Sequence, residues 1–244
     1  AKQGNSEAQW RLGTLYALGN GVIQDYQQAK YYYELSAKQG NSVAQLLLGN
    51  LYDSGNGVKQ DYQQAKHYFE LSAKQGNSEA QWRLGALYEL GNGVIQDYQQ
   101  AKYYYELSAK QGNSEAQWLL GALYDSGNGV IQDYQQAKYY YELSAKQGNS
   151  SAQWSLGNLY ALGNGVIRNF QQAKYYYELS AKQGNSEAQW RLGLLYEFGF
   201  GVRRDYQQAK YYYELSAKQG NSAAKESLEH IERIERNYYQ PKRR

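Results

Sequence analysis

The side chains that could carry out chemistry are few in this sequence and lie far apart along it. The chain has two histidines, His67 and His230, and no cysteine. A metal site or an activated nucleophile needs several such side chains converging on one point, and the sequence shows no such constellation around either histidine. We therefore expect no catalytic residue, no metal site and no bound cofactor, and we do not expect an enzyme.

Two recurring motifs resemble sites but have simpler explanations. Aspartates recur at Asp25, Asp61, Asp97, Asp133 and Asp205. Each directly precedes a helix-like segment, where a side-chain oxygen is needed to cap free backbone N–H groups. The Gly-Asn-Gly-Val motif lacks the third glycine of a nucleotide-binding loop and follows a helical pattern instead of a strand. Neither motif predicts a ligand.

The charge and hydropathy patterns exclude two classes of partner. A formal net charge of +3 is too small to indicate nucleic-acid binding. Helical repeats of about 35 residues can read RNA, but they need a basic groove, and the basic tail Pro241–Arg244 is short. There is no run of about 18 apolar residues and no signal-peptide pattern. We expect neither nucleic-acid binding nor membrane insertion.

An internal repeat supplies the elements that position every side chain. The string AKQGNS recurs with a period of 36 residues, beginning at Ala1, Ala37, Ala73, Ala109, Ala145, Ala181 and Ala217. One copy is too small to bury a core alone, so consecutive copies must stack. We assign six repeats, 1–36, 37–72, 73–108, 109–144, 145–180 and 181–216, followed by a C-terminal capping helix and basic tail at 217–244. The first residues resemble the end of a helix, so we expect either a segment cut from a longer array or a processed product.

The first half of each copy has the pattern of an amphipathic helix, which we call helix A. In the first copy a Ser-x-x-Gln capping box predicts a start at Ser6. Ala8, Leu12 and Leu15 fall on one narrow arc at helical spacing. Gly19 should end the helix, because glycine readily adopts the left-handed backbone of a helix end.

The second half predicts another helix, helix B. Asp25 should cap its start. Ala29, Tyr32, Tyr33 and Ser36 form its inward arc. We expect a neighbouring helix to pack closely on the glycine in the middle of helix A, since glycine costs a helix about 1 kcal/mol relative to alanine.

The repeated pattern resembles the Sel-one-like repeat (SLR) family, which is related to tetratricopeptide repeats. The first copy carries it through Ala8, Leu12, Gly13, Tyr16, Gly19, Gly21, Val22, Asp25, Ala29 and Tyr32. The resemblance implies an all-α fold, a right-handed α-solenoid of helix-turn-helix repeats with helix A lining the concave side. It also implies a scaffold or adaptor that acts through protein–protein contacts. Some bacterial members staple each repeat with a disulfide; this chain has no cysteine, so packing must hold it together.

The divergent C-terminal copy predicts a cap. Ala224, Leu228 and Ile231 keep the apolar arc of helix A. The positions of Trp10, Gly13 and Tyr16 are taken by Glu226, Glu229 and Glu232. A helix that keeps one apolar face and charges the other has a neighbour on one side only. Trp10, Gly13, Tyr16 and their counterparts should therefore face the next repeat.

Differences between the copies indicate where a partner would bind. Counting from Ala1, repeat positions 7, 11, 14 and 18 vary freely and share one side of helix A. On helix B, Gln27, Lys30 and Glu34 are identical in all six copies, so exposure alone does not explain the variation. We interpret the variable arc as a recognition surface for a protein or peptide. Neutral variation is the alternative, as in a structural or engineered array without a dedicated ligand.

The last full copy is rich in the residue types that dominate binding energetics. We expect its phenylalanines and arginines to anchor an apolar or acidic part of the partner; packing of Phe198 and Phe200 beneath the capping helix is the alternative. The five tryptophans at position 10 should pack between repeats. A monomer is favoured. The residues assigned to partner binding are Glu7, Arg11, Thr14, Leu18, Leu47, Asn50, Arg83, Ala86, Leu90, Leu119, Ala122, Ser155, Asn158, Leu162, Arg191, Leu194, Phe198, Phe200 and Arg203.

Overall fold

The computed structural model describes residues 4–239, and over this range the chain forms thirteen α-helices and no strand. The helices are α1 (Ser6–Leu18), α2 (Tyr26–Ala37), α3 (Ser42–Ser54), α4 (Tyr62–Lys74), α5 (Ser78–Leu90), α6 (Tyr98–Lys110), α7 (Ser114–Ser126), α8 (Tyr134–Lys146), α9 (Ser150–Leu162), α10 (Phe170–Lys182), α11 (Ser186–Phe198), α12 (Tyr206–Lys218) and α13 (Ser222–Tyr239). Up to α12, odd-numbered helices are the predicted A helices and even-numbered ones the B helices. The predicted basic tail lies outside the described residues.

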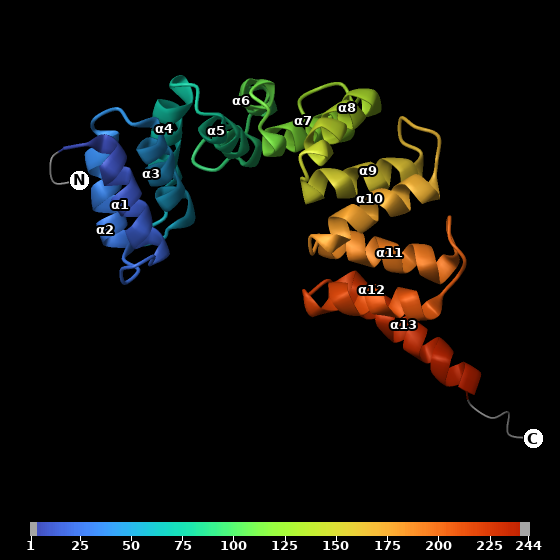
Figure 1. Ribbon diagram of the computed structural model, residues 1–244. Helices are drawn as coiled ribbons and strands as arrows, with labels where there is room; N and C mark the ends of the chain where they lie inside the picture. The colour runs from blue at the N-terminus through green and yellow to red at the C-terminus, as the bar shows by residue number, and fades with distance from the viewer. Residues whose placement is uncertain (1–3, 240–244) are drawn as a thin grey trace, which may run out of the picture. The chain divides into compact units, whose positions relative to one another are not determined.

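The helices are arranged in two compact units, Ala1–Gln132 and Asp133–Arg244. In the first unit each helix from α1 to α7 packs against the next, and in the second the same holds from α8 to α13 (Figure 1). This tandem packing of helix pairs is the α-solenoid arrangement that the repeat predicts.

Helix ends follow the predicted signals with one correction. The capping residue of α1 is Asn5, whose side chain accepts a hydrogen bond from the backbone N–H of Ala8, and not Ser6. Asn5 and Ser6 are adjacent, and both types cap helices well. Asp25 caps α2 as predicted, because its side chain accepts hydrogen bonds from the backbone N–H groups of Gln27 and Gln28. Gly19 ends α1 with a left-handed φ of 72°.

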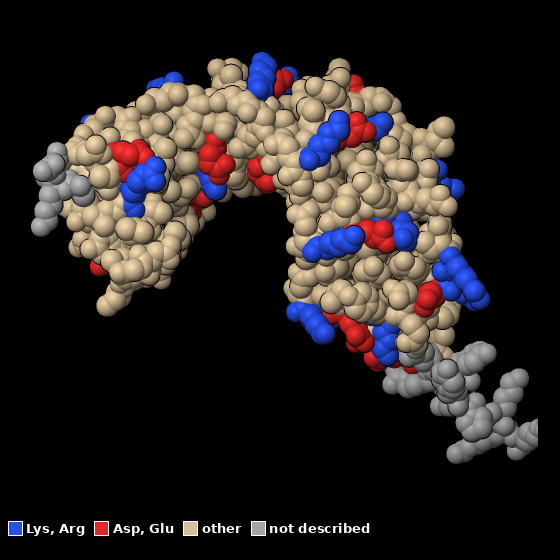
Figure 2. Space-filling model, in the orientation of Figure 1, with Lys and Arg blue, Asp and Glu red and all other residues tan. Residues whose placement is uncertain are grey.

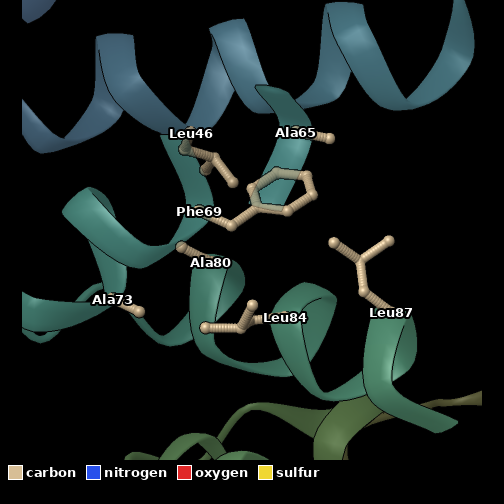
Figure 3. Packing of buried hydrophobic residues seen from close by; sticks show 7 residues of the cluster. All are labelled: Leu46, Ala65, Phe69, Ala73, Ala80, Leu84 and Leu87. Atoms are coloured by element: carbon tan, nitrogen blue, oxygen red, sulfur yellow. The ribbon is translucent and has the colours of Figure 1, made fainter. Parts of the chain in front are cut away.

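The core consists of the predicted apolar arcs. In the second copy Ala44 and Leu48 are fully buried. Figure 3 shows one cluster, in which the ring of Phe69 from α4 lies between side chains of α3 and α5. Its members are Leu46, Ala65, Phe69, Ala73, Ala80, Leu84 and Leu87. Each cluster of this kind joins two consecutive repeats, so no repeat has a core of its own.

The mid-helix glycine of helix A contacts helix B of its own repeat. A Cβ added to Gly49 would lie 2.4 Å from the Phe69 ring, and one added to Gly157 would lie 2.4 Å from the Tyr177 ring. The predicted close approach is confirmed. The prediction that this position faces the next repeat is wrong, because a ring on helix B of the same repeat fills the space above the glycine.

The capping helix and the tryptophans behave as predicted. In α13, Ala224 and Ile231 are fully buried, whereas Glu226 and Glu229 are exposed. Trp154 packs on a cluster that includes residues of the following repeat, which agrees with inter-repeat packing. No helix among the described residues is long and apolar enough to cross a membrane.

Candidate functional site

The residues assigned to partner binding differ widely in exposure. The exposed ones are Glu7, Arg11, Leu18, Leu90, Leu162, Phe198, Phe200 and Arg203. The half-buried ones are Thr14, Leu47, Asn50, Arg83, Ala86, Leu119, Ala122, Asn158, Arg191 and Leu194. Ser155 does not fit the prediction, because it is only 5% exposed. The variable arc therefore contains positions open to a partner and positions that serve the fold.

Position 14 of helix A serves the fold in repeats one and five, because it meets a buried tyrosine hydroxyl. In repeat one the hydroxyls of Thr14 and Tyr33 are 3.3 Å apart. In repeat five the Tyr177 hydroxyl donates a 2.7 Å hydrogen bond to Oδ1 of Asn158. A buried phenol without an acceptor is costly, so a polar residue here stabilises the repeat.

In two other copies, position 14 is apolar and position 17 supplies the acceptor. The Tyr105 hydroxyl donates to a Glu89 carboxylate oxygen at 2.5 Å, next to Ala86. The Tyr213 hydroxyl donates to Glu197 in the same way, also at 2.5 Å. Burial and the nearby carboxylate raise the pKa of both phenols, so they remain protonated donors.

Positions 14 and 17 thus vary together. Where position 14 is Thr14 or Asn158, position 17 is Ala17 or Ala161. Where position 14 is apolar in repeats three and six, position 17 is glutamate. One acceptor per buried hydroxyl accounts for this pattern. The sequence analysis left position 17 out of the site, although the paired substitutions were visible in the sequence.

Positions 7 and 11 form an ion pair in repeats one and three. Glu7 and Arg11 make an exposed ion pair at 2.7 Å, and Glu79 and Arg83 make one at 3.0 Å. The Arg83 guanidinium also lies over the Trp82 ring, 4.5 Å from its centroid. Exposed pairs one turn apart contribute about 0.3–0.5 kcal/mol, so these side chains remain free to exchange partners.

The invariant residues of helix B have structural roles that the sequence did not reveal. The side-chain amide of Gln27 donates to the backbone carbonyl of Gly57 in the next repeat. The ammonium of Lys30 pairs with Glu34 at 3.4 Å and lies over the Tyr52 ring of the next repeat. These residues are fixed by contacts between repeats. Their constancy is therefore no measure of how freely an exposed position drifts.

Position 18, at the end of helix A, has no such explanation. Leu18, Leu90, Leu162 and Phe198 are 54–66% exposed. In repeats two and four, Ser54 and Ser126 stand there, and each hydroxyl donates to a carbonyl of its own helix. Either type is compatible with the fold, so the exposed apolar side chains are not required for packing.

The following turn carries a second exposed apolar set, which the sequence analysis missed. Ile23, Ile95, Ile131 and Ile167 are 91–92% exposed. The signal was available, since Lys59 and Arg203 take the same repeat position and both prefer water. Isoleucine that exchanges with lysine and arginine does not lie in a core.

The last repeat presents an aromatic cluster with arginines beside it. Phe200 stacks on Phe170 of the preceding repeat at 4.9 Å and on Phe198 at 5.7 Å. Phe198 and Phe200 remain 54% and 45% exposed. No described carboxylate lies within ion-pair distance of Arg203 or Arg204. The cluster is an accessible apolar surface with unneutralised positive charge.

Among the described residues no group of three His, Asp or Glu side chains could hold a metal ion. On the face in Figure 2, Lys and Arg lie beside Asp and Glu in small groups, and most of the face is uncharged.

Comparisons with known proteins agree with this picture. Six consecutive segments match the family model described as Sel1 repeat, at residues 6–41, 42–77, 78–113, 114–149, 150–185 and 186–221. The structure is similar to a Sel1 repeat protein from Oxalobacter formigenes, with 35% identity, a TM-score of 0.84 and coverage of 88% of this chain and 89% of that one. No curated protein matches the chain.

Two further solved structures share the fold. One is c5321, a protective antigen of uropathogenic Escherichia coli strains with an SLR fold, at 38% identity and a TM-score of 0.81. The match covers 95% of this chain and 50% of that one, so the chain spans half the length of that protein. The other is the immunity protein Pa5087 from Pseudomonas aeruginosa, at 23% identity, a TM-score of 0.58 and coverage of 87% and 81%. At this identity the likeness concerns the fold alone.

Proposed function

Because the chain belongs to the Sel1 repeat family, we propose that it is a scaffold that binds a protein or peptide through the exposed part of its A helices. Proteins of this family are generally non-enzymatic scaffolds for protein interactions. The partner site of this chain is centred on position 18 and takes in the exposed members of positions 7 and 11.

The observation that carries the proposal is the exposure of Leu18, Leu90, Leu162 and Phe198. Single exposed apolar residues are common on protein surfaces. Here they recur at one repeat position, next to turns whose isoleucines are also exposed. Their burial against a partner would contribute about 25 cal/mol for each Å² removed from water, with no gain to the free chain.

The aromatic cluster of the last repeat favours a partner that is acidic as well as apolar at that end. Phe198 and Phe200 offer ring surface, and Arg203 and Arg204 offer guanidinium groups without a described carboxylate partner. Arginine and aromatic side chains are the types that carry most binding energy at interfaces. A carboxylate beside an apolar side chain on the partner would match both.

The test uses substitutions that the chain itself tolerates. Leu18, Leu90 and Leu162 are changed to serine, the residue found at the same position in repeats two and four. The matched control changes Tyr31 and Tyr103, exposed on helix B, to histidine, which repeat two carries there as His67.

Proteins captured by each variant from cells of the source organism are then quantified by mass spectrometry. The position-18 variant should lose specific partners that the original chain and the control retain, while its circular dichroism spectrum is unchanged. Equal capture by all three proteins would instead support the alternative of a structural array without a dedicated ligand.

A further inference from the structure

Repeat two differs from its neighbours at the buried ring of helix B. Phe69 stands where repeats one, three, five and six carry Tyr33, Tyr105, Tyr177 and Tyr213. The Phe69 ring is 1% exposed and packs on Gly49 as the tyrosine rings pack on their glycines. Repeat two therefore keeps the ring and lacks only the hydroxyl.

The acceptors for that hydroxyl are still present. Oδ1 of Asn50 is buried and has no hydrogen-bond partner among the described residues, whereas Oδ1 of its counterpart Asn158 accepts the Tyr177 hydroxyl. Repeat two also has Asp53 at position 17, where Glu89 serves as acceptor in repeat three. No described residue donates to the Asp53 carboxylate. Two acceptors remain for a donor that the repeat does not supply.

A cavity of about 190 Å³ lies beside Asp53 and Phe69, whereas Asn50 does not line it. Its lining residues are Asp53, Tyr62, Phe69, Trp82, Arg83, Ala86, Leu87, Leu90 and Asn92. We call this cavity the α3–α5 notch, since most of its lining comes from these two A helices and the turn after α5. The lining combines aromatic and aliphatic side chains with the Asp53 carboxylate, the Arg83 guanidinium and the Asn92 amide, so the cavity offers both apolar and polar contacts.

We propose that the α3–α5 notch binds a tyrosine side chain of the partner, whose hydroxyl donates to the Asp53 carboxylate, an acceptor that repeat two leaves open because Phe69 lacks a hydroxyl. The partner ring would lie against Phe69 and Trp82. A neutral donor fits better than a cation, because the Arg83 guanidinium already lines the same cavity as the Asp53 carboxylate.

The inference rests on the proposed function, because Leu90 belongs both to position 18 and to the notch wall. It names one contact of that surface and its chemistry. A small-molecule probe tests it without the partner, so its failure would leave the position-18 experiment standing.

The probe is p-cresol, the side chain of tyrosine as a free molecule. The full chain is labelled with 5-fluorotryptophan, and the ¹⁹F resonance of Trp82, assigned with the W82F variant, is followed during titration. We expect p-cresol to shift the Trp82 resonance saturably, and toluene, which lacks the hydroxyl, to do so at least several-fold more weakly. No saturable shift, an equal response to toluene, or a stronger response to n-butylammonium would overturn the proposal.

Two variants make the test specific. Phe69→Tyr restores the residue of the other repeats and supplies the missing hydroxyl internally; it should abolish the p-cresol response and raise the midpoint of thermal unfolding. Asp53→Ala keeps the cavity and removes an acceptor, and it should weaken the p-cresol response while leaving the toluene response unchanged. A p-cresol shift of the original size in Phe69→Tyr would contradict the notch as the site.

Discussion

Repeats two and five carry the same residue on helix A and use it differently. Asn50 and Asn158 both occupy position 14. In each case helix A of the next repeat carries a Trp–Arg pair, Trp82–Arg83 or Trp190–Arg191. In repeat five Tyr177 closes the hydrogen bond to asparagine, whereas in repeat two Phe69 leaves it open. One ring hydroxyl decides whether the buried acceptor at this variable position is satisfied within its own repeat.

The largest loss of stability should follow substitution of the helix A glycines on which the rings of Phe69 and Tyr177 pack. In Gly49→Ala and Gly157→Ala the added Cβ would overlap the ring of Phe69 or Tyr177. Such overpacking costs about 1–3 kcal/mol. We expect both variants to be less stable in urea unfolding, by similar amounts. A gain of about 1 kcal/mol, as alanine gives in an unpacked helix, would show that the rings are not held on the glycines.

Removing the Tyr177 hydroxyl from repeat five should give the next largest loss of stability. Tyr177→Phe leaves Oδ1 of Asn158 buried without a donor, at a cost of about 1–3 kcal/mol. The expected result is a lower urea midpoint with an unchanged slope. Tyr31→Phe, at an exposed hydroxyl on helix B, is the control and should have almost no effect. Equal stability of the original chain and Tyr177→Phe would remove the structural role assigned to position 14.

Adding a hydroxyl to repeat two should stabilise the chain, by less than the loss of the Tyr177 hydroxyl destabilises it. Phe69→Tyr gains a hydrogen bond to Asn50 or Asp53, worth about 0.5–1.5 kcal/mol. The urea midpoint should rise. A fall would mean that the buried ring of repeat two has no room for the hydroxyl oxygen, contrary to its likeness to repeat five.

The smallest expected effect concerns pH. Burial raises the pKa of Asp53 above its ordinary value, despite the nearby Arg83. A folded-state pKa above the unfolded one means that the native state binds the proton more tightly. Stability from this group is therefore present below the ordinary carboxyl range and is lost as pH rises through the raised pKa. Asp53→Asn should remove the fall in the urea midpoint that the original chain shows as pH rises above the ordinary carboxyl pKa of about 4. An unaltered pH dependence of the urea midpoint in Asp53→Asn would show that burial does not raise the pKa of Asp53.

Much of the fold could be predicted from sequence because the same local signals recur from repeat to repeat. Glycines at helix ends, Asp25 at a helix start and the arc through Leu48 are local signals, and each follows from backbone geometry or helical spacing. The cap assigned to Ser6 was displaced to Asn5 because two good capping residues are adjacent. The direction of Gly13 was missed since it depends on the helix B ring that covers it.

The site was less predictable because its determinants are three-dimensional. The variable arc was found, but Tyr177 meets Asn158 across 19 residues, and Tyr105 meets Glu89 across 16. Only these contacts show that positions 14 and 17 both supply the acceptor for the buried tyrosine hydroxyl of helix B. The constancy of Gln27 likewise has its cause in the next repeat. Differences between copies indicate where residues change, and the packing shows which changes compensate one another.

The most direct test of this account is the coupling free energy between residues 50 and 69. The original chain, Asn50→Ala, Phe69→Tyr and the double variant form a thermodynamic cycle, measured by urea unfolding. The account predicts that tyrosine at 69 stabilises the chain by at least about 0.5 kcal/mol more when residue 50 is asparagine than when it is alanine. A coupling energy of zero, with Asn158 and Tyr177 coupled in the parallel cycle, would show that repeat two does not hold an open acceptor.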